Sequence, residues 1–169
     1  MTRAITLILM LTALLHSAAI FGFFYAWVCS TMWGLDAAEP ATAIAAMQAM
    51  NASVRNAVFA PAFFATPFLL ILAGACLWTR KRRSSATFFG LAGLVYLFGG
   101  LVLTMAVNVP MNEALALVTI PDDANAAAQI WNDYSGPWQF WNQTRTVASG
   151  LSFLLAAWGA VLYRPVTMS

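Results

Sequence analysis

Four long apolar stretches, none containing Asp, Glu, Lys or Arg, constrain this chain more than any other feature. They cover residues 4–29, 57–79, 86–107 and 146–163. A helix needs about 20 apolar residues to cross a hydrocarbon core about 30 Å thick, and each stretch is near that length or longer. Because a spanning segment must satisfy its own backbone hydrogen bonds, the pattern predicts helices. We therefore expect an all-α, four-span antiparallel transmembrane helical bundle that forms one domain over residues 1–169.

The composition supports an integral membrane protein and excludes several soluble classes. Apolar residues make up 62% of the chain and charged residues only 8%, whereas soluble domains carry about 45–50% and about 25%. So few charges cannot cover a soluble enzyme of this size or keep a disordered chain in solution. The net charge of +2 is also too small for the basic surface of a nucleic-acid-binding protein. The expected partner is the lipid bilayer, with no nucleic acid.

The charged residues predict how the bundle is oriented. Under four spans, six of the eight basic residues fall on one side: Arg3, Arg80, Lys81, Arg82, Arg83 and Arg164. All six acidic residues fall on the other side, in the loops at about 30–56 and 108–145. Cytoplasmic flanks collect Lys and Arg. We therefore expect a multi-pass protein of the bacterial inner membrane, with both termini and the 80–85 turn cytoplasmic and the two long loops outside.

The outer loops are longer than simple connections require, which is typical of functional segments. Apolar residues at helical spacing predict an amphipathic helix over residues 40–56 of the first loop. In the second loop, Pro137 suits the first turn of a helix, so we expect the helix to start near Trp138 and continue into the fourth span.

Cysteine and histidine usage argues against redox and metal centres. Cys29 and Cys76 are expected at opposite ends of their spans, nearly a bilayer apart, so no disulfide is predicted. With one histidine and no carboxylate inside a span, neither a bis-His haem nor a di-iron site is expected. His16 itself lies near the middle of the first span. It is either a functional ionisable group or a neutral imidazole that is hydrogen-bonded within the bundle.

Polar residues gather at the outer ends of the third and fourth spans. One face of each span carries small or polar residues: Tyr96, Gly100, Thr104 and Asn108 on the third, and Asn142, Arg145, Ser149 and Ser152 on the fourth. The outer loops add further polar residues: Gln48, Asn51, Arg55, Asn56 and Asn112. Such stripes are expected to face the bundle interior. They predict either an amide-rich pocket under an aromatic lid, or helix caps and an interfacial aromatic belt with Arg145 snorkelling to the headgroups.

The pocket interpretation makes a specific prediction for Arg145. Its guanidinium would donate hydrogen bonds to the side-chain carbonyls of Asn108 or Asn112 and still offer N–H groups to a ligand.

The same residues fall into three blocks that resemble the anthrone oxygenase-like family of small four-helix membrane proteins. The first block comprises Met32–Leu35, Ala46–Asn51 and Val54–Phe59, and the second comprises Asn108–Leu115. The third block consists of Trp131, Tyr134, Trp138, Trp141, Asn142, Arg145 and Thr146. The blocks occur in order and extend over nearly the whole chain.

This resemblance implies oxidation of anthrones to anthraquinones by O₂ without metal or flavin, so no cofactor is expected. The implied ligand is a hydrophobic planar aromatic or quinol-type molecule, on whose rings Trp131, Tyr134, Trp138 and Trp141 would stack. Arg145 with Asn108, Asn112 and Asn142 would hold the oxyanion. Gln48, Tyr134 or His16 would assist proton transfer, and Asn51 and Asn56 would complete the pocket.

Two further questions stay open at the level of sequence. A non-catalytic membrane protein that binds a small molecule or a protein partner at its extracytoplasmic face is the alternative function. A homo-oligomer is also allowed, because Gly90, Gly93, Gly99 and Gly100 permit close helix approach on the third span.

Overall fold

The computed structural model describes residues 3–163, and these form helices and short connections without any strand, which confirms the all-α class. In chain order the helices are α1 (Arg3–Ala26), η1 (Trp27–Thr31), α2 (Met32–Asp36), α3 (Pro40–Ser53), α4 (Phe59–Thr79), α5 (Arg83–Tyr96), η2 (Leu97–Val102), η3 (Thr104–Asn108), α6 (Val109–Ala116) and α7 (Ala124–Val161). The three η segments are turns of π-helix, a wider form in which hydrogen bonds join residues five apart.

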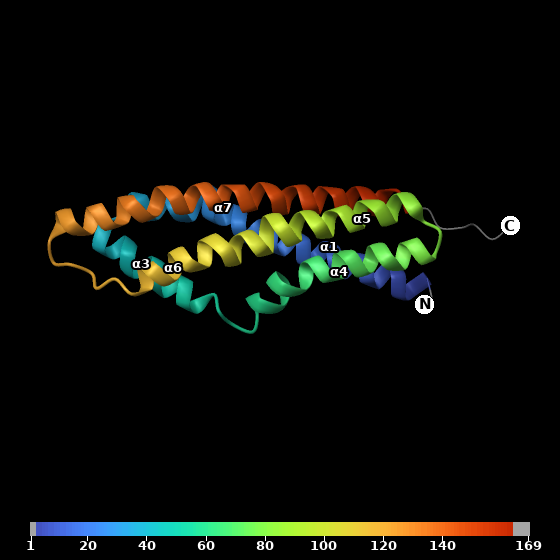
Figure 1. The fold of residues 1–169 in the computed structure, drawn as a ribbon, viewed down its shortest axis with the longest axis horizontal. Coiled ribbons are helices and arrows are strands. Elements are labelled where there is room, and N and C mark those ends of the chain that lie inside the picture. The colour runs from blue at the N-terminus through green and yellow to red at the C-terminus, as the bar shows by residue number, and fades with distance from the viewer. Residues whose placement is uncertain (1–2, 164–169) are drawn as a thin grey trace.

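The helices assemble into an elongated bundle (Figure 1). α1, η1 and α2 run on without a break from Arg3 to Asp36, and α5, η2, η3 and α6 do so from Arg83 to Ala116. α4 packs against α5 and α1, and α7 packs against both α5 and α1. The start of α1 and the end of α7 lie at the same end of the bundle as the turn between α4 and α5, as expected for an antiparallel arrangement (Figure 1).

Within residues 3–163, three helical segments are long and apolar enough to cross a membrane: Arg3–Asp36, Phe59–Thr79 and Arg83–Ala116. They support a helical membrane bundle. The predicted fourth span, 146–163, corresponds largely to the last part of α7, and its crossing stays a prediction. Because α7 ends at Val161, a span-length stretch at this end of the helix includes Arg145, which lowers the mean hydropathy. Arg164, one of the residues used to predict orientation, lies outside the described residues.

The outer connections contain more helix than the sequence suggested. α3 begins where expected, because the Glu39 side chain accepts a hydrogen bond from the Thr42 backbone N–H (3.0 Å). The start of α7 corrects the interpretation of Pro137. Asp123 caps that helix at the Ala126 N–H (2.9 Å), so Pro137 lies well inside it. A proline removes one backbone hydrogen bond from a helix without always ending it. The 108–145 loop is therefore helical except at 117–123.

Two groups of buried apolar side chains lie along the bundle. The first, which we call the inner cluster, joins α1, α4, α5 and α7 and includes Ile20, Leu70, Phe89 and Ala156. The second, the outer cluster, joins η1, α2, α3 and α7 and includes the following residues: Trp27, Met32, Ile44, Met47, Trp131 and Trp138.

Glycines of the third span bring helices of this same chain together. A Cβ added at Gly93 would lie 3.1 Å from the Pro67 backbone oxygen on α4, and one added at Gly99 would lie 2.5 Å from the Ala148 side chain on α7. These two glycines therefore serve packing within the bundle, and the homo-oligomer remains a prediction.

Candidate functional site

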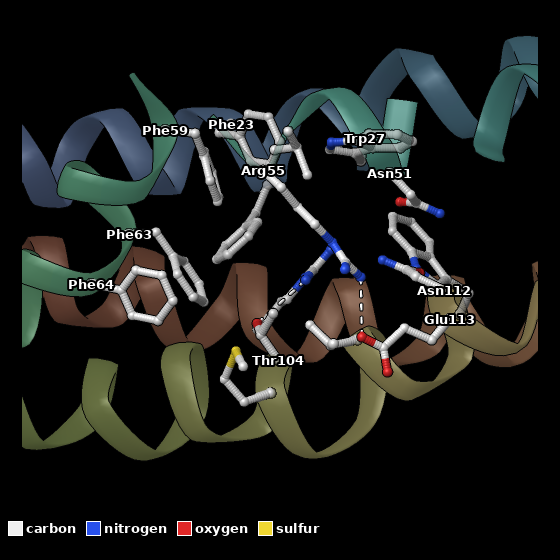
Figure 2. Close-up of a pocket in the computed structure, with 16 residues that line it drawn as sticks. Phe23, Trp27, Asn51, Arg55, Phe59, Phe63, Phe64, Thr104, Asn112 and Glu113 are labelled. Atoms are coloured by element: carbon white, nitrogen blue, oxygen red, sulfur yellow. Dashed lines mark hydrogen bonds and ion pairs between the residues drawn. The ribbon is translucent and has the colours of Figure 1, made fainter. Parts of the chain in front are cut away.

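A cavity of about 290 Å³ lies where the inner and outer clusters meet (Figure 2). Its polar wall consists of Asn51, Arg55, Thr104, Asn112, Glu113 and Arg145, and its apolar wall of Phe23, Phe24, Trp27, Val54, Phe59, Phe63, Phe64, Met105, Val109 and Trp138. The volume is at the small end of the range for small-molecule pockets, and mainly apolar walls with a few polar groups are typical of such sites.

Arg145 is the buried cation of this cavity, with only 5% of its surface exposed. Its Nε and one terminal nitrogen donate to Asn142 Oδ1 (3.0 and 2.9 Å), and the other terminal nitrogen donates to Thr104 Oγ1 (3.3 Å). The guanidinium also lies over the rings of Phe24 and Trp138, at 4.4 and 5.2 Å from their centroids. The side chain therefore points into the bundle, and the snorkelling alternative is wrong.

The acceptors of Arg145 differ from those that we predicted. Asn142, one turn earlier on the same helix, takes the place expected for Asn108 or Asn112. Asn142 is held in turn by α1, because its Nδ2 donates to the Phe24 backbone oxygen (3.3 Å). A pair at i and i+3 on one helix needs no tertiary movement to form, and this explains why the local partner prevails.

Asn112 is the second polar anchor, and it belongs to a chain of hydrogen bonds. Its Oδ1 accepts from Tyr134 Oη (2.9 Å) and from Trp138 Nε1 (2.8 Å). Tyr134 Oη in turn accepts from Asn51 Nδ2 (3.5 Å). Burial raises the pKa of Tyr134 well above its usual value, so the phenol stays protonated and acts as a donor. With Oδ1 doubly engaged, the Asn112 Nδ2 atom remains for a ligand in the cavity.

An ion pair lies at the rim of the cavity. Arg55 donates to Glu113 Oε1 at 3.2 Å, and 58% of each side chain is exposed. Both residues line the cavity, and Glu113 is the only carboxylate among the lining residues.

π-helical turns supply part of the wall. Trp27 comes from η1, and Thr104 and Met105 come from η3. Such turns are rare and frequent at functional sites, because they shift side chains around the helix axis and free backbone carbonyls. One example is the Gly100 oxygen, which accepts from Thr104 Oγ1 (2.6 Å). A pattern of apolar residues in sequence carries no signal for such turns.

The sequence interpretation missed the aromatic wall of the site, and it also missed Glu113 as a lining residue. Phe23 and Trp27 from the first span, and Phe59 and Phe63 from α4, line the cavity, and the Phe23 and Phe59 rings are in contact (centroids 4.7 Å apart). Each pair is four residues apart, which is the only signal available. That spacing is equally typical of a helix core, and so it did not single out these residues.

Of the predicted site residues, Asn51, Asn112, Trp138 and Arg145 line the cavity, and Tyr134 and Asn142 contact these lining residues. Asn108 lies between Thr104 and Asn112 in the sequence of the same helix. It is fully buried, and neither side-chain amide atom has a hydrogen-bond partner among the described residues.

The other predicted residues do not line the cavity. Gln48 donates to the backbone oxygens of Leu115 and Val118 (2.9 and 3.0 Å), and Asn56 accepts from the backbone N–H groups of Val58 and Phe59 at the start of α4. These two side chains therefore fix the helices around the cavity.

His16, Trp131 and Trp141 also lie away from it. His16 bonds the Thr12 backbone oxygen of its own helix through Nδ1 (2.9 Å), and Trp131 donates to Asp36 Oδ1 (3.0 Å). Trp141 packs edge-on against Phe140.

Among residues 3–163, no group of three or more His, Cys, Asp or Glu side chains is arranged to hold a metal ion, and no disulfide joins Cys29 and Cys76.

In a comparison with known protein families, residues 50–155 match the family described as anthrone oxygenase. This segment is more than half of the chain. The chain belongs to the anthrone oxygenase family. No curated protein and no solved structure matches it.

The segment that matches the anthrone oxygenase family contains the whole polar wall, from Asn51 to Arg145. The wall formed by Phe23 of α1 and Trp27 of η1 precedes that segment. The anthrone oxygenase family match therefore covers all the polar and charged residues of the cavity wall, whereas α1 and η1 add only apolar residues to that wall.

Proposed function

We propose that this protein oxidises a planar aromatic compound of the anthrone or quinol type with O₂, without a bound metal or flavin. The observation that supports this most strongly is the buried Arg145 guanidinium in an aromatic-lined cavity. A cation held in a desolvated site stabilises an anion much more than it would in water. The family to which the chain belongs supports the same class of chemistry.

The reaction balances without an added cofactor. An anthrone CH₂ loses a proton to give an enolate, whose negative charge resides on the carbonyl oxygen. The electron-rich enolate reduces O₂ and forms a carbon–oxygen bond, and a proton completes the hydroperoxide. Loss of water then leaves a second carbonyl group, so the sum is anthrone plus O₂ giving anthraquinone plus water.

The cavity wall offers residues for the two charged steps of this reaction, which are stabilisation of the enolate oxygen and removal of the proton. Arg145, together with the free Nδ2 of Asn112, would stabilise the enolate oxygen. Glu113 would accept the proton, because Arg55 bonds only its Oε1 atom and, among residues 3–163, its other carboxylate oxygen accepts no hydrogen bond. Gln48 and His16 lie away from the cavity, and the protonated Tyr134 positions Asn112.

The proposal includes the cell location expected from the charge pattern. Both termini would be cytoplasmic in a bacterial inner membrane, so the cavity would lie toward the outer surface. Labelling a cysteine placed in the 80–82 turn of a Cys29→Ser variant with a membrane-impermeant reagent tests this, since labelling from outside intact cells would contradict it.

The function is tested with purified protein in detergent, by following conversion of anthrone to anthraquinone under air with a metal chelator present. We expect a rate above that in buffer, and a fall to the buffer rate for Arg145→Lys, because an ammonium cannot bond Asn142 and Thr104 as the planar guanidinium does. Arg83→Lys, at the opposite end of the bundle, is the matched control and should keep the rate. A wild-type rate equal to buffer, or one that requires added metal, would overturn the proposal. Binding without oxidation would instead support a non-catalytic binding protein.

A further inference from the structure

We infer that the cavity opens sideways into the hydrocarbon of the bilayer, and that its ligand is an amphiphile whose planar head lies at Arg145 and whose apolar tail extends into lipid between Phe64 and Met105. This inference rests on the proposed function for the nature of the head.

The first observation is that apolar residues of the cavity wall also form part of the outer surface. Phe64 on α4 is 47% exposed and Met105 on η3 is 45% exposed, although both line the cavity. A residue that lines a cavity and also the surface marks an opening. Here both sides of that opening are apolar and belong to helices able to cross a membrane.

The second observation is the depth of this opening. The basic turn between α4 and α5 marks one membrane boundary, just beyond Thr79. At 1.5 Å per residue, Phe64 lies about 22 Å from Thr79, which is within a hydrocarbon core about 30 Å thick. By the same measure Met105 lies about 28 Å from Ala86, near the far edge of the core. Both side chains therefore meet lipid tails.

The ionic rim lies farther out. Glu113 is about 40 Å from Ala86 along its helix, which is beyond the hydrocarbon core. The Arg55–Glu113 pair is exposed and in water at this depth. The cavity thus has a wet, charged side and a dry, apolar side.

The third observation is that polarity changes along the cavity in the same direction. Figure 2 shows Phe59, Phe63 and Phe64 at one end, and Asn51, Asn112 and Glu113 at the other. A ligand that matches both ends has oxygen atoms at its head and hydrocarbon behind it. A cavity of about 290 Å³ has room for a ring system, so a long chain must leave through the apolar opening.

Binding of two anthraquinones tests the inference, because these product analogues need no turnover. One carries a methyl group and the other a dodecyl chain at the same ring position. Apparent affinities are obtained from the rise in the unfolding temperature of the protein in lipid nanodiscs at increasing analogue concentration. We expect the wild-type protein to bind both analogues.

Met105→Trp fills the opening and should weaken dodecyl binding at least tenfold, with less than a twofold effect on the methyl analogue. Val102→Trp is the matched control: Val102 is an equally exposed apolar residue of the same helix outside the cavity, and both affinities should be kept. Failure of the wild type to bind the dodecyl analogue, or equal effects of the two tryptophans, would overturn the lateral opening alone. Failure to bind either analogue would overturn the proposed function as well, whereas binding of both without oxidation of anthrone would overturn only the oxidation.

Discussion

The inner and outer parts of the bundle are held together by different interactions. Around the inner cluster, small residues allow backbones to touch, and hydroxyl groups bond to backbone oxygens, as Tyr96 does to Phe63 (3.0 Å) and Ser152 to Ala92 (2.8 Å). Around the outer cluster, side chains bond to side chains from distant parts of the chain. Asp36, for example, accepts from Trp131, Ser135 and Gln139. In lipid, close packing of helices stabilises the bundle. A region that is partly in water can also hold networks of polar side chains, which give specificity for a ligand.

The largest effect is expected at the boundary between these two parts. Arg145→Ala removes both donors to Asn142 Oδ1 and the donor to Thr104, and it leaves buried polar atoms unpaired. We expect a loss of about 3 kcal/mol in the free energy of unfolding, measured by denaturant titration in detergent. Arg83→Ala, which removes an arginine that packs over Trp78, should cost less than about 1 kcal/mol. Equal losses would show that the buried network adds nothing.

The next effect concerns close packing in the inner part. A Cβ at Gly74 would lie 3.0 Å from the Gly90 nitrogen and 3.1 Å from the Ala86 oxygen, both of them backbone atoms. Gly74→Ala must therefore separate α4 from α5, and we expect a loss of about 2 kcal/mol. Gly22→Ala has open space around the new methyl group and should cause no loss. Thermal unfolding of the two variants side by side checks the difference.

A smaller effect is expected at Asp36, which joins α2 to α7 in the outer part. Asp36→Ala removes the acceptor of three side-chain hydrogen bonds from α7, but the carboxylate is exposed, so water replaces part of what is lost. We expect a loss of about 1 kcal/mol. Asp133→Ala, which loses bonds only to Gln129 of the same helix, is the control and should fall within about 0.5 kcal/mol of wild type. A larger loss of unfolding free energy for Asp133→Ala than for Asp36→Ala would argue that the hydrogen bonds of Asp36 do not hold α2 against α7.

The smallest effect is expected at the rim. Arg55→Gln breaks an ion pair whose two side chains are 58% exposed, so solvent and salt already screen it. The change in unfolding free energy should stay below about 0.5 kcal/mol. A loss greater than 1 kcal/mol, persisting at high salt, would mean that the rim is desolvated and belongs with the buried network.

Much of the fold could be predicted from the sequence, because apolar length decides which segments span a membrane. The start of α7 could not, since residues 124–136 are polar and alanine-rich and Pro137 resembled a helix start, whereas the Asp123 cap decided it. For the site too, some residues could be predicted from the sequence and others could not. Arg145 stands out as a charged residue at the end of an apolar span, and Asn112 and Asn51 as amides of the outer loops. An aromatic residue such as Phe59 looks alike whether it faces a cavity or a core.

The partner of Arg145 illustrates the remaining limit. The sequence places Asn142 one turn away and Asn108 on the facing helix, and both are reasonable acceptors. The structure has Asn142, the partner on the same helix, as the acceptor, whereas a bond to Asn108 would depend on how the third span is rotated, which results from packing over the whole bundle.

The uninterrupted 38-residue α7 limits which parts of this molecule can move against one another. At about 57 Å it is far longer than the bilayer core is thick, so this one helix contributes to both parts. Asn142 and Arg145 lie on it at the level of the cavity. The cavity wall also includes residues of α3 and α4, which are joined by the short non-helical link 54–58, and we expect any widening of the cavity to occur at that link. Asn56, which donates to the Ser53 oxygen and accepts from the Phe59 N–H, connects the two ends of this link.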